Sequence, residues 1–194
     1  MEKAVRALQK NGFEVRTFET KEMATEELFK EIAPDEVVGF GGSTTIQQME
    51  LFEKMTDRGN MVHWHWKAED KPNAIKQATL SKVYITSTNA ITEDGKLVNK
   101  DGVGNRTASM FSGHDTVYVL AGKNKIVRNY ADAIYRIEHI AAPLNSKRLN
   151  LKTPCVYTGV CEDCDSPQRI CNVEVVINKK PDGVNKVIIY LINK

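Results

Sequence analysis

Cysteines are the first residues whose type and spacing suggest chemistry, and all of them lie in one short segment. Cys155, Cys161, Cys164 and Cys171 follow the spacing C-x5-C-x2-C-x6-C. The central C-x2-C pair is typical of half a zinc site or half an iron–sulfur site. A zinc ion or cluster on these thiolates, a redox-active pair and buried structural thiols are three open interpretations. Because the N-terminus lacks a secretory signal, we expect a cytoplasmic protein, in which a disulfide framework is disfavoured.

A glycine turn, "GFGGSTT" at residues 39–45, is the second feature with chemical potential. Gly41 and Gly42 permit a tight turn and close approach of a ligand to the backbone. The helix predicted after them offers free N–H groups, and Ser43 and Thr44 add hydroxyls. We therefore predict a bound phosphate or carboxylate at this turn. The stretch matches neither the P-loop nor the full G-x-G-x-x-G pattern, so a capped strand-to-helix turn without a ligand is the alternative.

A long polar stretch, Ser87 to Arg106, is dense in Asn, Asp and Gly. We expect mostly a loop without regular structure, with a hairpin turn and a short strand after it at 92–98 and a helix opening after 101, and loops of this length are usually functional or mobile. Asn89, Asp101, Asn105 and Arg106 are its polar candidates, and Arg106 suits bidentate pairing with a carboxylate or phosphate. The alternatives are turn formers for the asparagines and a surface ion pair for Arg106.

The remaining candidates are lysines and histidines. In residues 121–127, "AGKNKIV", Lys123 or Lys125 would neutralise an anion, with solvated surface as the alternative. His63 and His65 share one face of a predicted strand, and a half-exposed strand is favoured over a metal pair because no third ligand lies nearby. His114 is a further candidate site residue.

Strands and helices alternate along the chain, which predicts an α/β fold with a largely parallel sheet covered on both faces. The carboxyl ends of such strands form the usual ligand site. We expect one domain over residues 1–194, with an N-terminal helical segment at 1–33 and the Cys-rich segment 152–172 packed on the same domain. Helices are predicted at 4–11, 20–30, 44–55, 72–80 and 129–145, the last broken or kinked by Pro143. Strands are predicted at 35–40, 60–66, 82–87, 115–122, 155–159, 173–178 and 186–192.

Charge and hydropathy exclude two classes of partner. The net charge is +2, so the chain has no basic excess of the kind that binds nucleic acid. No apolar run approaches the length of a membrane span.

Several stretches in fixed order resemble the LUD domain family, the lactate-utilisation protein domain of bacteria and archaea. They are "GFGGSTT", "STNAIT-DG-LVN-DG-GNR", "AGKNKIV", "RIEHIAAPLN" and "TGVCEDCDSPQRICN", from about Val37 to the C-terminus. The family is similar in fold to the superfamily of ribose-5-phosphate isomerase and the CoA-transferases. The resemblance therefore implies a three-layer α/β/α sandwich.

The resemblance also implies a role, accessory or catalytic, in oxidising L-lactate or a related small hydroxy acid. It implies a small carboxylate or phosphate ligand and partner proteins that carry iron–sulfur clusters, and it leaves a homodimer open. Motif positions carried over as candidate binding residues are Gly41, Gly42, Ser43, Thr44, Asn89, Asp101, Gly102, Gly104, Asn105, Arg106, Gly122, Asn124 and Lys125.

The wider superfamily implies a different chemistry as a second possibility. CoA-transferases use a glutamate nucleophile, and Glu93 is the only candidate in a comparable loop, although its turn is expected to be exposed. A phosphosugar-binding enzyme and a non-catalytic metal or redox partner module also stay open. The sequence leaves open whether the chain is an enzyme by itself.

Overall fold

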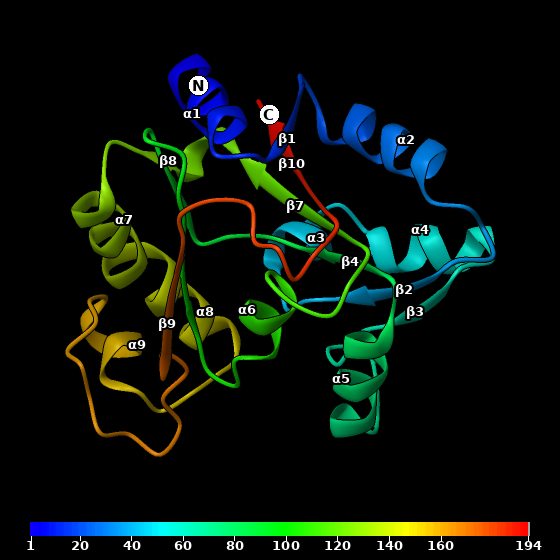
Figure 1. Ribbon diagram of the computed structural model, residues 1–194. Coiled ribbons are helices and arrows are strands. Elements are labelled where there is room, and N and C mark those ends of the chain that lie inside the picture. The colour runs from blue at the N-terminus through cyan, green and yellow to red at the C-terminus, as the bar shows by residue number, and fades with distance from the viewer. Residues whose placement is uncertain (194) are drawn as a thin grey trace.

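A six-stranded sheet forms the centre of the computed structural model, which describes residues 1–193 (Figure 1). All neighbouring strands in it are parallel, which confirms the predicted α/β class. Their order is β1 (Glu14–Phe18), β10 (Lys186–Ile192), β7 (Thr116–Gly122), β4 (Val83–Thr86), β2 (Val37–Phe40) and β3 (Met61–His63).

Helices cover both faces of this sheet, because successive strand residues point to opposite faces and both sets are apolar. Phe40, Ile85 and Tyr190 point to one face, and Tyr84 and Val119 to the other. The first face carries α2 (Lys21–Glu31), α3 (Thr44–Gln48) and α4 (Leu51–Arg58). The second face carries α1 (Glu2–Lys10), α5 (Lys71–Leu80) and α6 (Asn105–Ser109).

A second, four-stranded sheet packs on that second face, and the sequence predicted only parts of it: the strand at 173–178 and a hairpin turn with a short strand after it at 92–98. Its order is β8 (Ile126–Val127), β5 (Ala90–Thr92), β6 (Leu97–Asp101) and β9 (Val173–Ile177). The expectation of a mostly irregular loop from Ser87 to Arg106 is therefore wrong. Ile91 and Leu97 form a cross-strand pair and are fully buried, so burial overrides the turn-forming composition of the segment.

Residues 155–159 form helix α9 (Pro154–Thr158) instead of the predicted strand. Pro154 occupies the first turn, where a missing N–H costs nothing, and Gly159 ends the helix in the left-handed region. Cys155 is buried while Tyr157 is 78% exposed, so the two do not share a face as a strand would require.

Four other predicted segments differ from the structure. The helix predicted at 44–55 is two helices, α3 and α4, and the strand predicted at 60–66 is shortened to β3. Residues 1–33 are not purely helical, because β1 adds an edge strand between α1 and α2. Pro143 does not break its helix: α7 (Tyr130–Arg136) continues through a π-helical turn (Ile137–Ala141) into α8 (Ala142–Arg148). The π-helical turn accommodates the missing N–H of Pro143, and the carbonyl of Glu138 in that turn accepts from Cys161 N at 2.9 Å.

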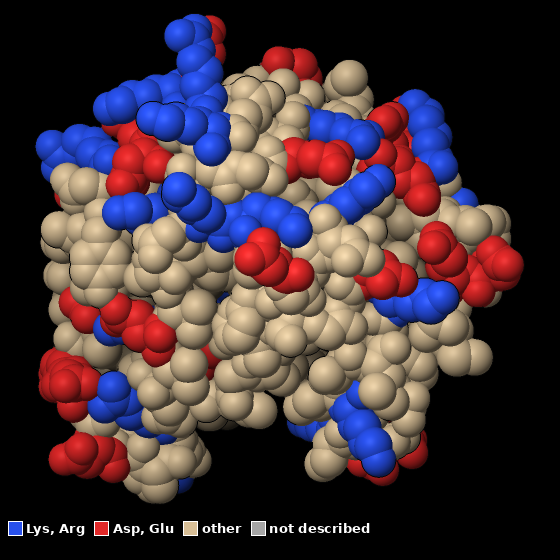
Figure 2. All heavy atoms as spheres, viewed as in Figure 1, with Lys and Arg blue, Asp and Glu red and all other residues tan. Residues whose placement is uncertain are grey.

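The surface adds two observations. Acidic and basic side chains are interspersed on the face in Figure 2, and a notch opens at its lower edge between the part with α9 and β9 and the part with α5. Within residues 1–193, no helix has the length and apolar character needed to cross a membrane.

Candidate functional site

Three of the predicted loops meet at the carboxyl ends of the neighbouring strands β2, β4 and β7. Lys125 joins them, since its Nζ donates to Thr45 Oγ1 at 2.9 Å and to Ser87 Oγ at 2.7 Å. Thr45 follows β2, Ser87 follows β4, and Lys125 ends a short 3-10 helix that follows β7. We call Thr45, Ser87, Lys125 and the nearby Arg106 and Arg136 the strand-end cluster.

The two glycines of the turn make room for the protein's own side chains. A β-carbon at Gly41 would lie 2.5 Å from Thr86 Oγ1 and 3.0 Å from Arg106 Cγ. One at Gly42 would lie 2.9 Å from Trp66 Nε1. These contacts explain why the turn needs glycine without invoking a ligand.

The hydroxyls of the turn are divided between capping and the cluster. Ser43 caps α3, because its Oγ accepts from Ile46 N at 3.3 Å. Thr44 is exposed, and Thr45 is the turn residue whose hydroxyl reaches Lys125. The polar group that the turn contributes to the cluster is therefore Thr45, which the sequence prediction had passed over.

Arg106 is buried, and its guanidinium is committed to the protein itself. Its Nε lies 3.2 Å from Asp101 Oδ2 and forms an ion pair with it. The geometry is not that of a hydrogen bond, and Asp101 Oδ2 has no hydrogen-bond donor among the described residues. Burial lowers the pKa of Arg106, and the Asp101 carboxylate opposes this. Its Nη atoms donate to Ser87 O, Asn99 Oδ1, Asn89 Oδ1 and Lys100 O at 3.0, 2.7, 3.2 and 2.9 Å. Arg106 therefore ties β4, β6 and α6 together and has little left for a ligand.

Lys125 and Arg136 differ from Arg106 because neither has a carboxylate partner among the described residues. Burial lowers the pKa of Lys125 to about 7, and the charges of Arg136 and Arg106 add to the effect. Arg136 donates from Nε to Asn124 O at 3.1 Å and from Nη1 to Asn89 O at 2.6 Å. Burial lowers the pKa of Arg136 too, with no opposing acid. Two such basic groups side by side favour an anion.

Other predicted residues support the loop after β6. Asp101 Oδ1 accepts from Gly104 N at 3.1 Å, and Gly104 begins α6 in the left-handed region at φ 88°, which favours glycine. A β-carbon at Gly102 would lie 3.2 Å from Ile170 Cα, so the cysteine segment packs against this loop. Asn105 is the first residue of α6.

Four further candidates lie outside the cluster or at its border. Glu93 sits in the turn between β5 and β6 and pairs with Lys3 of α1 at 2.7 Å, which gives no support to a nucleophile. His114 is buried, stacks on Tyr84 and binds Ser81 O through Nδ1, so it is a structural residue. Gly122 and Asn124 flank Lys123, and the Asn124 side chain is exposed.

Sequence reasoning missed Thr45, Ser87 and Arg136 as cluster residues. Ser87 stands directly after the strand 83–86, which was a usable signal. Arg136 lies between Ala133 and Ile137, the buried residues of its helix, and so borders the apolar face. A basic residue at such a border is often only a surface residue whose stem covers the core.

The cysteines form a second region, the cysteine segment, residues 155–171. All four side chains are free thiols and line one cavity of about 10 Å³, room for about one water-sized atom. Burial raises the pKa of Cys171, and Arg169 opposes this. Within residues 1–193, no three His, Cys, Asp or Glu side chains are placed to hold a metal. A zinc ion or iron–sulfur cluster here stays a prediction.

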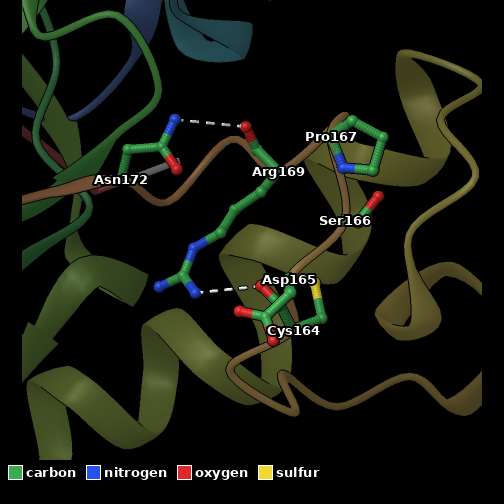
Figure 3. Close-up of a pocket in the computed structure, with 6 residues that line it drawn as sticks. All are labelled: Cys164, Asp165, Ser166, Pro167, Arg169 and Asn172. Atoms are coloured by element: carbon green, nitrogen blue, oxygen red, sulfur yellow. Dashed lines mark hydrogen bonds between the residues drawn. The ribbon is translucent and has the colours of Figure 1, made fainter.

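An open pocket of about 320 Å³ adjoins the cysteine segment (Figure 3). Arg169 reaches across it, and its Nη1 donates to Cys164 O at 3.0 Å. Asn172 closes the other side, donating from Nδ2 to Arg169 O at 3.4 Å. Neither cavity is lined by a residue of the strand-end cluster.

Comparisons with known proteins confirm the resemblance found in the sequence. A crystal structure of a DUF162 family protein from Deinococcus radiodurans matches with a TM-score of 0.58 and 9% identity, covering 98% of this chain and 94% of that one, which shows the fold. Chaetomium thermophilum eIF2B beta matches weakly, with a TM-score of 0.38 and 12% identity over 58% of this chain and 44% of that one. No curated protein matches significantly. The LUD domain family model matches residues 1–192, and the chain therefore belongs to the LUD domain family.

Proposed function

We propose that this protein binds a small 2-hydroxy or 2-oxo carboxylate, such as L-lactate or pyruvate, at the strand-end cluster. The observation that carries this is the pair Lys125 and Arg136, two partly buried basic groups without a carboxylate partner among the described residues. They lie at the carboxyl ends of parallel strands, where α/β proteins usually bind ligands. Membership of the LUD domain family supports lactate utilisation as the setting.

Arg136 and Lys125 contact different parts of the ligand in this proposal. The free Nη2 of Arg136 pairs with the ligand's carboxylate, while its Nε and Nη1 stay bound to backbone carbonyls. Lys125, with a pKa lowered to about 7, faces the ligand's C2 oxygen and accepts the hydroxyl proton of a 2-hydroxy acid. Oxidation to the 2-oxo acid also removes the C2 hydrogen, which leaves as a second proton to solvent, and releases two electrons, which would pass one at a time to iron–sulfur partner proteins of the kind that the family resemblance implies.

Calorimetric titration tests the binding. We expect L-lactate and pyruvate to bind, and Arg136→Met to weaken both about tenfold to a hundredfold, because a charge-assisted hydrogen bond contributes about 1.5–3 kcal/mol. Affinity should rise as the pH falls from 8 to 6, since Lys125 gains its proton in that window. The exposed Lys123, two residues away, provides the control Lys123→Ala, which should leave affinity unchanged.

Three results would contradict the proposal in whole or in part. No heat from either acid would exclude it, and equal affinity in wild type and Arg136→Met would place the ligand elsewhere. Phosphate binding that is tighter than either acid would identify a phosphate site in place of a carboxylate site.

A further inference from the structure

The amine of Lys125 is held in the geometry of a nucleophile. Ser87 Oγ donates its own hydrogen to Leu120 O, so it accepts from Lys125. Thr45 Oγ1 is the second acceptor. A neutral amine has two hydrogens and one lone pair, so these two hydroxyls satisfy both hydrogens and leave the lone pair open.

The surroundings favour that neutral form. Within residues 1–193 no carboxylate pairs with Lys125, and the charges of Arg106 and Arg136 disfavour a third proton. Together with burial they bring the pKa of Lys125 to about 7, so the free amine is far more populated at neutral pH than in an ordinary lysine. Desolvation and a neighbouring cation are the known means of activating a lysine nucleophile. Lys123, on the same short helix, is exposed and lacks these surroundings.

We propose that Lys125 condenses with the carbonyl of a 2-oxo acid to form an imine at the strand-end cluster, a step that rests on the proposed binding of such acids there. The lone pair of Nζ adds to C2 and forms the C–N bond, and the former amine proton moves to the carbonyl oxygen. The resulting carbinolamine loses its hydroxyl and the second amine proton as water, leaving C=N. No oxidant or reductant is required.

Arg136 makes the approach specific for an acid. Its Nε donates to the carbonyl of Asn124, the residue just before Lys125, which places guanidinium and amine at the same backbone segment. A carboxylate on the unshared Nη2 would bring the adjacent C2 carbonyl toward Lys125. Simple aldehydes and ketones without a carboxylate should therefore react less than pyruvate.

Borohydride trapping tests the inference. Incubation with pyruvate and sodium borohydride should add one carboxyethyl group per chain, located on Lys125 by peptide mass spectrometry. The adduct should be lost in Lys125→Ala and Lys125→Met, kept in Lys123→Ala, and absent when L-lactate replaces pyruvate. Its yield should increase from pH 6 to pH 8, opposite to the pH dependence expected for ionic binding.

The outcomes separate this inference from the binding proposal. Pyruvate that binds in calorimetry without an adduct on Lys125, or with an adduct on exposed lysines only, overturns the imine and leaves the binding intact. Neither binding nor adduct overturns both. Circular dichroism of the Lys125 variants establishes that a lost adduct reflects the missing amine and not a failure to fold.

Discussion

The strand-end cluster and the cysteine segment differ in how their candidate functional residues are brought together. The cluster gathers side chains from segments far apart in the chain, and its members bond to one another between strands of the central sheet. The cysteine segment consists of residues that are neighbours in sequence. Arg169 connects them mainly by donating hydrogen bonds to the backbone carbonyls of Cys164 and Cys171. Both regions contain an arginine with several partners, but Arg106 is buried and Arg169 pairs with the exposed Asp163.

The difference teaches which signal to follow to a ligand. The two cavities are lined by the cysteine segment and by Asn172 or nearby residues. Lys125 and Arg136, which have no acidic partner among the described residues, lie in the strand-end cluster. An open hollow beside solvent costs the fold little, but burying a cation without a partner costs stability and persists mainly where function requires it. We therefore give more weight to Lys125 and Arg136 than to cavity volume.

The largest expected effect separates the two arginines. Arg106→Ala removes the donors that connect β4 and β6 and leaves Asp101 buried without its cation. The free energy of unfolding should fall by about 3–5 kcal/mol in urea titrations, the usual cost of breaking a buried pair. Arg169→Ala should lower it far less, because its ion pair with the exposed Asp163 contributes little and what is lost is its hydrogen bonds to two backbone carbonyls of the same short segment. Equal losses in both variants would break the comparison.

A second, smaller effect concerns Lys125, whose burial should destabilise the fold. Its pKa is about 7 in the folded protein and 10.5 when unfolded, so between these pH values the unfolded chain holds a proton that the folded one has lost. Stability from this group therefore rises with pH across that window, and the full cost of the charge is present below pH 7. Lys125→Met should raise the free energy of unfolding by up to about 2 kcal/mol at pH 6.

The gain from Lys125→Met should shrink by pH 9.5, where the wild-type amine is already neutral in the folded state. Thermal unfolding of both proteins at the two pH values measures this. Lys123→Met is the matched control, since its side chain is exposed. A gain that is independent of pH would mean that Lys125 titrates normally.

The smallest expected effect is in the cysteine segment. Replacing Cys161, Cys164 and Cys171 with serine should change the free energy of unfolding by less than about 1 kcal/mol, because all three are partly exposed. Cys155, which is 8% exposed, should resist thiol reagents until the protein unfolds. One zinc or iron per chain after anaerobic purification, lost in the triple variant together with several kcal/mol, would make the cysteine segment a metal centre.

The sequence predicted the central sheet because its strands are short apolar runs, such as "DEVVGF" and "DTVYVLAG", that are buried on both faces. It missed the edge strand β1 and the strand β5, and it placed a strand where α9 lies. At β5 the local composition favours turns, at α9 it favours a strand, and tertiary burial or a helix end decides the outcome. The same limit applies to the site, where Arg106 was predicted together with its partners Asn89 and Asp101, whereas Lys125 was predicted without its partners Thr45 and Ser87.

By itself, the sequence determined the alternation of strands and helices, the family and the three loops that meet at the strand ends. These depend on periodicity and on turn residues, which are local properties of the chain. Only the tertiary structure decided that Arg106 is bound to Ser87, Asn99 and Asp101, while Lys125 and Arg136 have no acidic partner in the described part of the chain. Whether a basic side chain is paired depends on neighbours that are distant in sequence, and packing alone brings those neighbours together.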